Sequence, residues 1–437
     1  MPSQFKVRIW KINDLPPDWF KRTRTTDEKT IESIECKVRT IISEVKNTGD
    51  SALVKFTKEF DKANLRAKDL RVTHEEIRKA YTMVTDEQVS ALKLMKEKIS
   101  ANEKLALKQT GTSTSKEGIT IQNKVIPIDS VGCYIPGGQA AYPSTVVMTV
   151  IPAKVAGVPR IVVCSPPNKN GRINSLVLVA ADICEADEVY KIGGVQAIAA
   201  LAFGTDTIEP VMKIFGPGNK YVTLAKTLVS NDVAIDMPAG PSEVLVLADK
   251  TANPKFVAAD MISQAEHGVD SVAGLVTTSE KLAEKVCDWL ARFAGSAKRQ
   301  EIVEKALTDY GFIIICKTKD ELINLANIFA PEHLEVITQN APEIANKITS
   351  AGLILLGSYS PVSLSDYGSG TNHVLPTGGF AHALSGLSAL DFTRRISIVD
   401  SSKEGLIALK NHVKVMTKAE NLPNHYKAIA VRLENEE

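Results

Sequence analysis

Residues 236–267 read DMPAGPSEVLVLADKTANPKFVAADMISQAEH and contain, in direct succession, a turn, a strand and a helix. A turn rich in Pro and Gly leads into an apolar strand at 244–247, and a short polar loop then leads into a helix over 254–267. Residues three apart on a helix share a face, so Gln264 and His267 are expected to point the same way. An amide oxygen and an imidazole on one face can begin a metal site or a polar pocket.

The same alternation of strand and helix continues after this stretch. Its expected order is strand 272–277, helix 279–294, strand 312–316, helix 318–327, strand 334–338, helix 341–349 and strand 352–356. An earlier unit shows the same rhythm, with helix 144–156, strand 160–164, helix 173–184, strand 188–192, helix 195–202 and strand 211–215. Such alternation is typical of parallel sheets covered by helices. The sequence therefore predicts an α/β protein with two tandem, incomplete Rossmann-like domains.

The N-terminal quarter has a different pattern. It is helical over 27–61, with a break at Gly49, and again over 87–108. Thr73 followed by Glu76 is typical of a capping box that opens another helix. From about 387 the chain leaves the α/β rhythm, and helical pieces lead to a charged end that either covers its own subunit or reaches across a dimer.

These patterns divide the chain into four parts. We expect an N-terminal arm (1–25), a first α/β domain with a helical N-terminal part (26–133 and 243–386), a second α/β domain (134–242) and a C-terminal arm (387–437).

Composition limits the classes of function. The 437 residues carry a net charge of +1, which gives no electrostatic reason to expect nucleic acid as a partner and favours a small-molecule substrate. No apolar run approaches the ~18 residues that cross a membrane, and the N-terminus lacks the apolar core of a signal peptide. The six cysteines show no CxxC spacing, which favours free thiols in a reducing compartment over a redox or catalytic cysteine. We therefore expect a cytoplasmic protein.

Three glycine-containing loops each follow a strand pattern and precede a helix pattern: YIPGG (134–138), IGGVQ (192–196) and FGPGNKY (215–221). None is the GxGxxG fingerprint of dinucleotide-binding folds. Glycines at such places allow close backbone approach, and a helix N-terminus favours phosphate. Ordinary tight turns are the alternative explanation. Three such loops at the carboxyl ends of neighbouring strands nevertheless indicate a ligand crevice.

Four histidines have carboxylates nearby in the sequence. His333 lies in APEHLE (330–335), His373 in the loop SDYGSGTNH (365–373) and His425 in the tail, while His267 ends the opening helix. A single histidine is more often a surface or core residue than a ligand. Four of them around one α/β core favour a site with imidazole and oxygen ligands for Zn²⁺ or a similar borderline divalent metal.

Glu332 and His333 are adjacent groups that can both exchange protons near neutral pH. They are a candidate acid–base pair. A capped helix start with a solvated Glu explains the same residues, and the sequence pattern leaves both interpretations open.

Together these motifs resemble the histidinol dehydrogenase family. The resemblance extends from Ile119 to the tail and rests on VGCYIPGG, KIGGVQAIAALAFGT, FGPGNKYV, IDMPAGPSEVLVLAD, SQAEHG, APEHLE and SDYGSGTNHVLPTGG. It implies a homodimeric, zinc-dependent enzyme that oxidises L-histidinol to L-histidine through L-histidinaldehyde, with two molecules of NAD used in succession, in the final steps of histidine biosynthesis.

The resemblance also implies a role for particular residues. The implied metal ligands are Gln264, His267, Asp366 and His425, the last reaching across the dimer from a swapped C-terminal arm. The implied catalytic pair is Glu332 and His333. Substrate contacts fall on Ser242, Gln264, His267, Glu332, His333, Asp366, His373, Glu420 and His425, and NAD contacts fall on Tyr134, Gln196 and Asn219.

Two alternative functions remain open at this point. One is a sister dehydrogenase that acts on another small hydroxylated compound, and the other is a catalytically silent homologue that binds a nucleotide or a metal. The presence of Ser242, Glu420 and His425 beside the catalytic pair favours histidinol over the first. A silent homologue has no need of the pair together with a complete ligand set.

Overall fold

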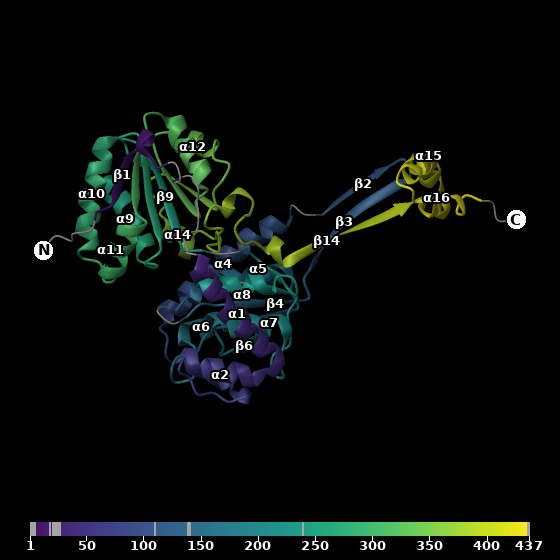
Figure 1. Cartoon of the computed structure of the whole chain (residues 1–437), viewed down its shortest axis with the longest axis horizontal. Helices are drawn as coiled ribbons and strands as arrows, with labels where there is room; N and C mark the ends of the chain where they lie inside the picture. The colour runs from purple at the N-terminus through teal and green to yellow at the C-terminus, as the bar shows by residue number, and fades with distance from the viewer. Residues whose placement is uncertain are drawn as a thin grey trace.

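The computed structural model describes residues 6–16, 19, 28–108, 111–137, 141–237 and 240–434. Two α/β bodies, each built on a parallel sheet, lie next to each other, and a third, antiparallel sheet projects away from both (Figure 1). The expected α/β architecture with two parallel sheets is confirmed. No helix in the described part of the chain is long and apolar enough to cross a membrane.

The opening stretch belongs to a six-stranded sheet in which every pairing is parallel. Its order is β1 (Arg8–Lys11), β11 (Phe312–Ile315), β10 (Val272–Thr277), β9 (Glu243–Ala248), β12 (His333–Ile337) and β13 (Leu353–Leu356). The N-terminal arm was not expected to contain a strand, yet β1 lies at the edge of this sheet. Trp10 there packs against the core beside β11, which gives the arm an apolar anchor.

Helices cover both faces of this sheet: α9 (Pro254–Ala265), α10 (Glu280–Ala294), α11 (Gln300–Asp309), α12 (Lys319–Phe329), α13 (Ala341–Ala345) and α14 (Val362–Tyr367). Along β9, Val244 and Val246 pack into one core with α9 and α10. Leu245 and Leu247 pack into the other with α12. Because both faces of the strand are buried, its sequence is continuously apolar after Glu243.

The second sheet is also parallel, with the order β6 (Glu188–Tyr190), β5 (Arg160–Cys164), β4 (Ser130–Tyr134), β7 (Lys213–Phe215) and β8 (Ala234–Ile235). Its helices are α5 (Pro143–Ala156), α6 (Ser175–Ile183), α7 (Gly194–Phe203) and α8 (Lys220–Val229). Short 3-10 turns complete the described chain: η1 (Ile12–Asp14), η2 (Ala67–Asp69), η3 (Phe380–His382) and η4 (Ala389–Phe392).

The N-terminal helices are α1 (Glu28–Thr48), α2 (Asp50–Phe60), α3 (His74–Tyr81) and α4 (Asp86–Lys108). The break at Gly49 and the capping box of Thr73 and Glu76 are confirmed. These helices pack on the second sheet and its helices, whereas the division of the sequence grouped 26–133 with 243–386. Val38 and Leu53 share a core with Ile198 of α7. The grouping was wrong because helix amphipathicity shows that a face is buried but not which body buries it.

The third sheet has the antiparallel order β14 (Thr393–Ser401), β3 (Ile119–Pro127) and β2 (Thr112–Lys116). It carries α15 (Lys403–Ala419) and α16 (Pro423–Ala430) at its far end (Figure 1). Only helical pieces were expected after 387, so the strand β14 is a correction. Its apolar residues Ile396, Ile398 and Val399 are exposed in the single chain, and hydrophobic burial within one chain therefore does not account for this strand.

Candidate active site

The candidate catalytic residues lie where β9 and β12 begin. The chain passes from β9 to β10 and β11 on one side, and β12 then lies on the other side of β9. This reversal of strand order brings the amino ends of β9 and β12 together, with His333 beside Val244 in the register. Ligands of open α/β sheets usually bind at the carboxyl ends of strands. Ser242 and Glu332 lie at the opposite edge.

Backbone and side chains interlock at this edge. The N–H of Glu243 donates to Oε2 of Glu332 at 2.7 Å, and the N–H of Glu332 donates to Oε2 of Glu243 at 3.3 Å. The N–H of Gly378 donates to the other oxygen of Glu243 at 3.0 Å. Glu243 and Glu332 are both buried. The solvated Glu332 of the alternative interpretation is therefore wrong, and so is the helix start, because β12 begins at His333.

The orientation of His333 determines which of its nitrogens can react. Nδ1 lies 3.1 Å from the backbone oxygen of Glu243. A carbonyl oxygen can only accept, so Nδ1 carries the proton in this contact and Nε2 of the neutral ring has a free lone pair. Nε2 is buried and has no hydrogen-bond partner. A buried, unpartnered acceptor of this kind is suited to take a proton from a bound molecule.

Two carboxylates act on the ring of His333. Nδ1 lies 3.6 Å from Oε2 of Glu332, and Nε2 lies 3.8 Å from Oδ1 of Asp366. Burial lowers the pKa of His333, but these carboxylates and the backbone oxygen of Glu243 outweigh it, and the pKa lies above its ordinary value. His333 thus lies between two acidic groups from different elements.

Asp366 and His373 complete this cluster. Asp366 lies on α14, is buried, and has a raised pKa because burial outweighs the effect of His333 and His267. Nδ1 of His373 lies 4.0 Å from Oδ1 of Asp366. Burial, and then the electrostatic influence of the neighbouring His333, lowers the pKa of His373 to about 4, so its imidazole is neutral near pH 7.

Gln264 and His267 come from the end of α9. The helix ends at Ala265, slightly earlier than expected, but the N–H of His267 still donates to the carbonyl of Gln264 at 3.2 Å. Gln264 is buried, whereas His267 is exposed, with Nδ1 3.1 Å from the carbonyl of Ser263. Since a carbonyl accepts, Nε2 of His267 is the nitrogen left with a lone pair.

These donors fit a divalent metal in their chemistry. An amide oxygen, a neutral imidazole and a buried carboxylate whose charge is poorly compensated are the ligand types that Zn²⁺ takes. Among the described residues no three His, Cys, Asp or Glu side chains are grouped so as to hold a metal by themselves. Two of the implied ligands, His267 and Asp366, interact within one chain, because His267 acts electrostatically to lower the pKa of Asp366. His425 does not join them.

Glu420 and His425 lie far from this cluster in the same chain. Glu420 follows α15 and His425 lies on α16, and both are exposed. These helices lie at the tip of the projecting sheet (Figure 1). Residues of one chain therefore do not complete the implied ligand and substrate set.

The implied NAD contacts lie at the other parallel sheet. Tyr134 ends β4, and its hydroxyl accepts the N–H of Gly194 at the start of α7, at 3.2 Å. Asn219 caps α8, its side chain accepting from Tyr221 and Val222. The expected loops thus follow β4, β6 and β7, but only β4 and β7 are neighbours, because β5 separates β4 from β6. Gly138 lies outside the described residues.

Close contacts of three glycines bring the loops after these separated strands together. Gly137 and Gly193 both pack against Pro166, which follows β5. Gly216 has φ +116° and lies so close to the carbonyl of Tyr134 that a Cβ would overlap it. The loops after β4, β5, β6 and β7 therefore converge at the carboxyl edge, where the strand order reverses between β4 and β7.

Gln196 has the most unsatisfied side chain in this region. It is fully buried, and neither its amide nitrogen nor its amide oxygen has a hydrogen-bond partner. Buried polar groups are normally paired. An unpaired amide beside Tyr134 and Gly194 is consistent with a ligand that supplies the missing partners.

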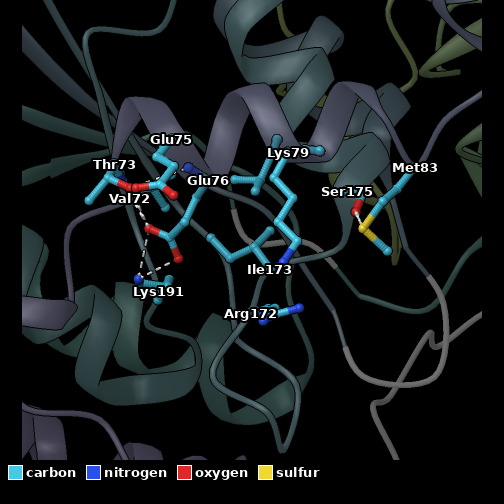
Figure 2. A pocket seen from close by; sticks show the side chains of 12 residues that line it. Val72, Thr73, Glu75, Glu76, Lys79, Met83, Arg172, Ile173, Ser175 and Lys191 are labelled. Carbon is cyan, nitrogen blue, oxygen red and sulfur yellow. Dashed lines mark hydrogen bonds and ion pairs between the residues drawn. The ribbon is translucent and has the colours of Figure 1, made fainter.

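A hollow of about 270 Å³ lies elsewhere, between α3 and α6 (Figure 2). Its buried cation, Lys191, already pairs with Glu76 at 2.8 Å. The capping box of Thr73 holds the same carboxylate. This hollow contains none of the candidate site residues and offers no buried cation free for a ligand.

Known proteins resemble the chain over nearly its whole length. The family model described as histidinol dehydrogenase matches residues 24–433. The chain belongs to the histidinol dehydrogenase family. Histidinol dehydrogenase from Bacteroides thetaiotaomicron is 48% identical over 92% of this chain and 94% of its own length. The same enzyme from Methanocaldococcus jannaschii is 45% identical over 97% and 98%.

A solved structure agrees with these relatives. The crystal structure of histidinol dehydrogenase from Elizabethkingia anophelis covers 99% of this chain and 99% of its own, with 40% identity and a TM-score of 0.92. Membership of the histidinol dehydrogenase family identifies the chain as an oxidoreductase. The roles of the individual residues above remain predictions.

Reasoning from the sequence missed two residues in this member of the histidinol dehydrogenase family. Glu243 tethers Glu332 and His333, and its signal was a single acidic residue at the start of a buried apolar strand. Asp61 follows α2 and acts electrostatically on Tyr134. Burial raises its pKa to about 6, and its Oδ2 has no hydrogen-bond partner. No sequence pattern connects Asp61 with a loop more than seventy residues later.

Proposed function

We propose that the chain catalyses the NAD-dependent oxidation of L-histidinol to L-histidine through L-histidinaldehyde, with zinc at the site, as the final steps of histidine biosynthesis. The observation that carries the proposal is the buried Nε2 of His333, an acceptor without a partner between Glu332 and Asp366. The names of the relatives supply the substrate.

The residues that would hold the metal are Gln264, His267, Asp366 and His425 of the partner subunit. The last comes from the partner because His425 lies at the tip of the projecting arm, away from α9 and α14 of its own chain. A bound Zn²⁺ supplies positioning of the substrate and polarisation of its oxygen. The neutral imidazole of His373, beside Asp366, adds a hydrogen-bonding group at the substrate's edge of the site.

In the first oxidation, Nε2 of His333 accepts the hydroxyl proton of the alcohol while the carbon loses a hydride to the nicotinamide. The carbonyl of Glu243 holds the Nδ1 proton and keeps the ring in the required tautomer. This step converts the alcohol and one NAD into the aldehyde, one NADH and one proton. Ser242, next to Glu243, would contact the substrate from the start of β9.

In the second oxidation, water attacks the aldehyde while the carboxylate of Glu332 removes a proton from that water. Oε2 of Glu332 already accepts the N–H of Glu243, so we assign the role of base to Oε1. His333 again accepts a proton as the hydrated aldehyde loses its hydride to a second NAD. The two steps release the acid, two NADH and the matching protons. Glu420 and His425 of the partner subunit would close the substrate pocket.

The NAD would bind where the loops of the second sheet converge. Tyr134, Gln196 and Asn219 stand at this edge, and the N-termini of α7 and α8 favour a pyrophosphate. The unpaired amide of Gln196 would gain its hydrogen bonds from the dinucleotide.

The exposed apolar surface of the arm supports the proposed dimer. Its strands and helices leave Val399, Ile407, Val415 and Val431 largely exposed in one chain, and such apolar surface is usually covered by a partner. A swapped arm would bury these residues and would also place His425 at the site of the partner subunit.

The test uses purified protein with NAD and L-histidinol, with and without a strong chelator, and counts NADH per histidine formed. Two NADH per histidine and loss of activity on chelation are expected. Zinc should restore the activity. Absence of NADH with L-histidinol, or activity indifferent to chelation, would show the proposal to be wrong, and a NADH yield only with other alcohols would point to a sister dehydrogenase.

A further inference from the structure

Glu335 is a buried carboxyl on the strand that carries His333. The two residues lie two apart on β12, so their side chains leave the same face of the sheet, the face that Ile337 shares with α9. Glu335 is 1% exposed. Its Oε1 accepts the N–H of Val362 at 2.9 Å, while Oε2 is buried and meets no N–H or O–H donor.

Asp260 is the group that faces Glu335 from α9. It lies one helical turn before Gln264, on the same face of the helix. The carboxyls of Asp260 and Glu335 are within hydrogen-bonding reach of each other. Two ionised carboxylates have no hydrogen to place between them, so this contact requires one proton.

The electrostatics keep that proton in place. Burial raises the pKa of Asp260 to about 6. Burial first, and then the charge of Asp260, raises the pKa of Glu335 well above its ordinary value. Two carboxyls this close together, one buried and one partly buried, behave in this way because both cannot readily ionise together.

We propose that Asp260 and Glu335 share one proton and act as positioning residues that fix α9, β12 and α14 relative to one another. The proposal rests on the proposed function, since these three elements carry the candidate metal ligands and His333. Asp260 lies on α9, the helix that carries Gln264 and leads to His267. Val362 begins the helix of Asp366. Glu335 lies between them, so one side chain aligns three parts of the site that are far apart in sequence.

Neither carboxyl is a catalytic residue in this proposal, because neither touches the substrate or the reacting atoms. Their effect is on ligand geometry. Outer groups that orient metal ligands typically change metal affinity by about 10–100-fold when they are removed. An ordinary packing residue would change stability without a selective change in zinc affinity.

Glu335→Gln and Glu335→Leu separate the two roles. The amide of Gln accepts from Val362 and donates to the carboxylate of Asp260, so it rebuilds both contacts without a shared proton. Leu rebuilds neither. We expect Glu335→Gln to hold zinc within about 3-fold of wild type and Glu335→Leu to lose about 10-fold or more. Glu301→Leu, an exposed carboxylate of α11 changed in the same way, is the matched control and should bind zinc as wild type does.

The shared proton has its own readout. Infrared difference spectra between wild type and Glu335→Gln at pH 7, with and without zinc, should show the carbonyl band of a protonated carboxyl in wild type alone. The difference isolates this pair from other raised carboxyls such as Asp61 and Glu103. Wild-type protein without that band would overturn the shared proton.

Asp260→Ala guards against a misfolded Leu variant. It removes only the link to α9 and leaves Val362 bound to Glu335, and we expect it to lose zinc affinity in the same direction. Wild-type zinc affinity in both Asp260→Ala and Glu335→Leu would overturn the positioning role. The band and the affinity are measured without histidinol or NAD. A band and a zinc loss in protein that does not oxidise histidinol would therefore refute the proposed function and leave the pair intact.

Discussion

Glu243 and Glu332 hold each other through two backbone-to-carboxylate hydrogen bonds, at 2.7 Å and 3.3 Å, across the start of two neighbouring parallel strands. Each residue donates its own N–H to the other's side chain. The exchange fixes the carboxylate of Glu332 beside His333. It therefore links the carboxylate of Glu332 directly to the β9–β12 pairing.

Glu243→Gln tests this exchange. The carboxylate of Glu243 accepts from both Gly378 and Glu332, and an amide can accept only once in the same place. One buried N–H is left facing another donor, so we expect a loss of about 1–3 kcal/mol in the free energy of unfolding, measured by denaturant titration. Turnover should fall as well. The exposed Glu343→Gln on α13 is the control, and equal stability of the two variants would contradict the assigned role.

His333→Asn tests the proton acceptor. The variant keeps a polar side chain but removes Nε2, so kcat with histidinol should fall by about 10²–10⁴-fold. Zinc content, measured by atomic absorption, should stay near that of wild type, since His333 is not among the proposed ligands. His74→Asn, at the exposed start of α3, should leave both unchanged. Wild-type kcat in His333→Asn would remove His333 from the mechanism.

Mixed dimers test whether two chains build one site. His267→Ala and His425→Ala should each be inactive alone. If the arm is swapped, a heterodimer of the two has one site with both changes and one site with neither. Random exchange of equal amounts should then restore about a quarter of wild-type activity, because half of the dimers are mixed and each has one intact site. No recovery after confirmed subunit exchange would show that His425 serves its own chain or none.

Asp61→Asn tests the unpaired carboxyl near Tyr134. The pKa of Asp61 is about 6 in the folded chain, above the ordinary 3.8, so its ionisation destabilises the fold. The contribution to stability is full below about pH 4 and is lost as the pH rises through 6. At pH 8 the Asn variant should be more stable by the order of 1 kcal/mol, since solvent screens this partly exposed group.

The stability difference between wild type and Asp61→Asn should vanish near pH 4, which thermal melts across the pH range can follow. Asp288→Asn, an exposed carboxylate of α10, is the control and should show no such pH-dependent gain. A constant difference at every pH would mean that the carboxyl of Asp61 is not the titrating group.

Gly216→Ala tests the convergence of the NAD loops. Gly216 has φ +116°, and a Cβ there would overlap the carbonyl of Tyr134, so the loop after β7 must move away from β4. We expect a loss of about 1–3 kcal/mol in the free energy of unfolding. Relative to wild type, the KM for NAD should rise more than the KM for histidinol. Gly295→Ala, where φ is negative and the nearest atom is 3.4 Å from a new Cβ, should be neutral. Equal KM values for NAD in both variants would separate this loop from dinucleotide binding.

Local patterns in the sequence carried much of the fold. Strand and helix periodicity predicted the two parallel sheets, and the strands at 160–164 and 272–277 match the structure residue for residue. A buried parallel strand is apolar on both faces, and this signal needs no knowledge of its neighbours. The chemistry of histidine, amide and carboxylate donors likewise indicated a metal, and the family motifs indicated the substrate.

Only the tertiary structure decided which of these groups meet. The amino ends of β9 and β12 adjoin because the strand order reverses, and this sets Glu243 against Glu332. Asp366 comes close to His333 from a third element, α14. The N-terminal helices pack on the second sheet, and β14 pairs with β3 although the residues of β14 belong to none of the apolar cores of one chain. Periodicity is a local property of the backbone, whereas these contacts depend on which buried faces fit together over long separations. The sequence of the helix at 254–265 and the two residues after it indicated a site. The other residues of that site come from strands and loops that no local pattern connects to this helix.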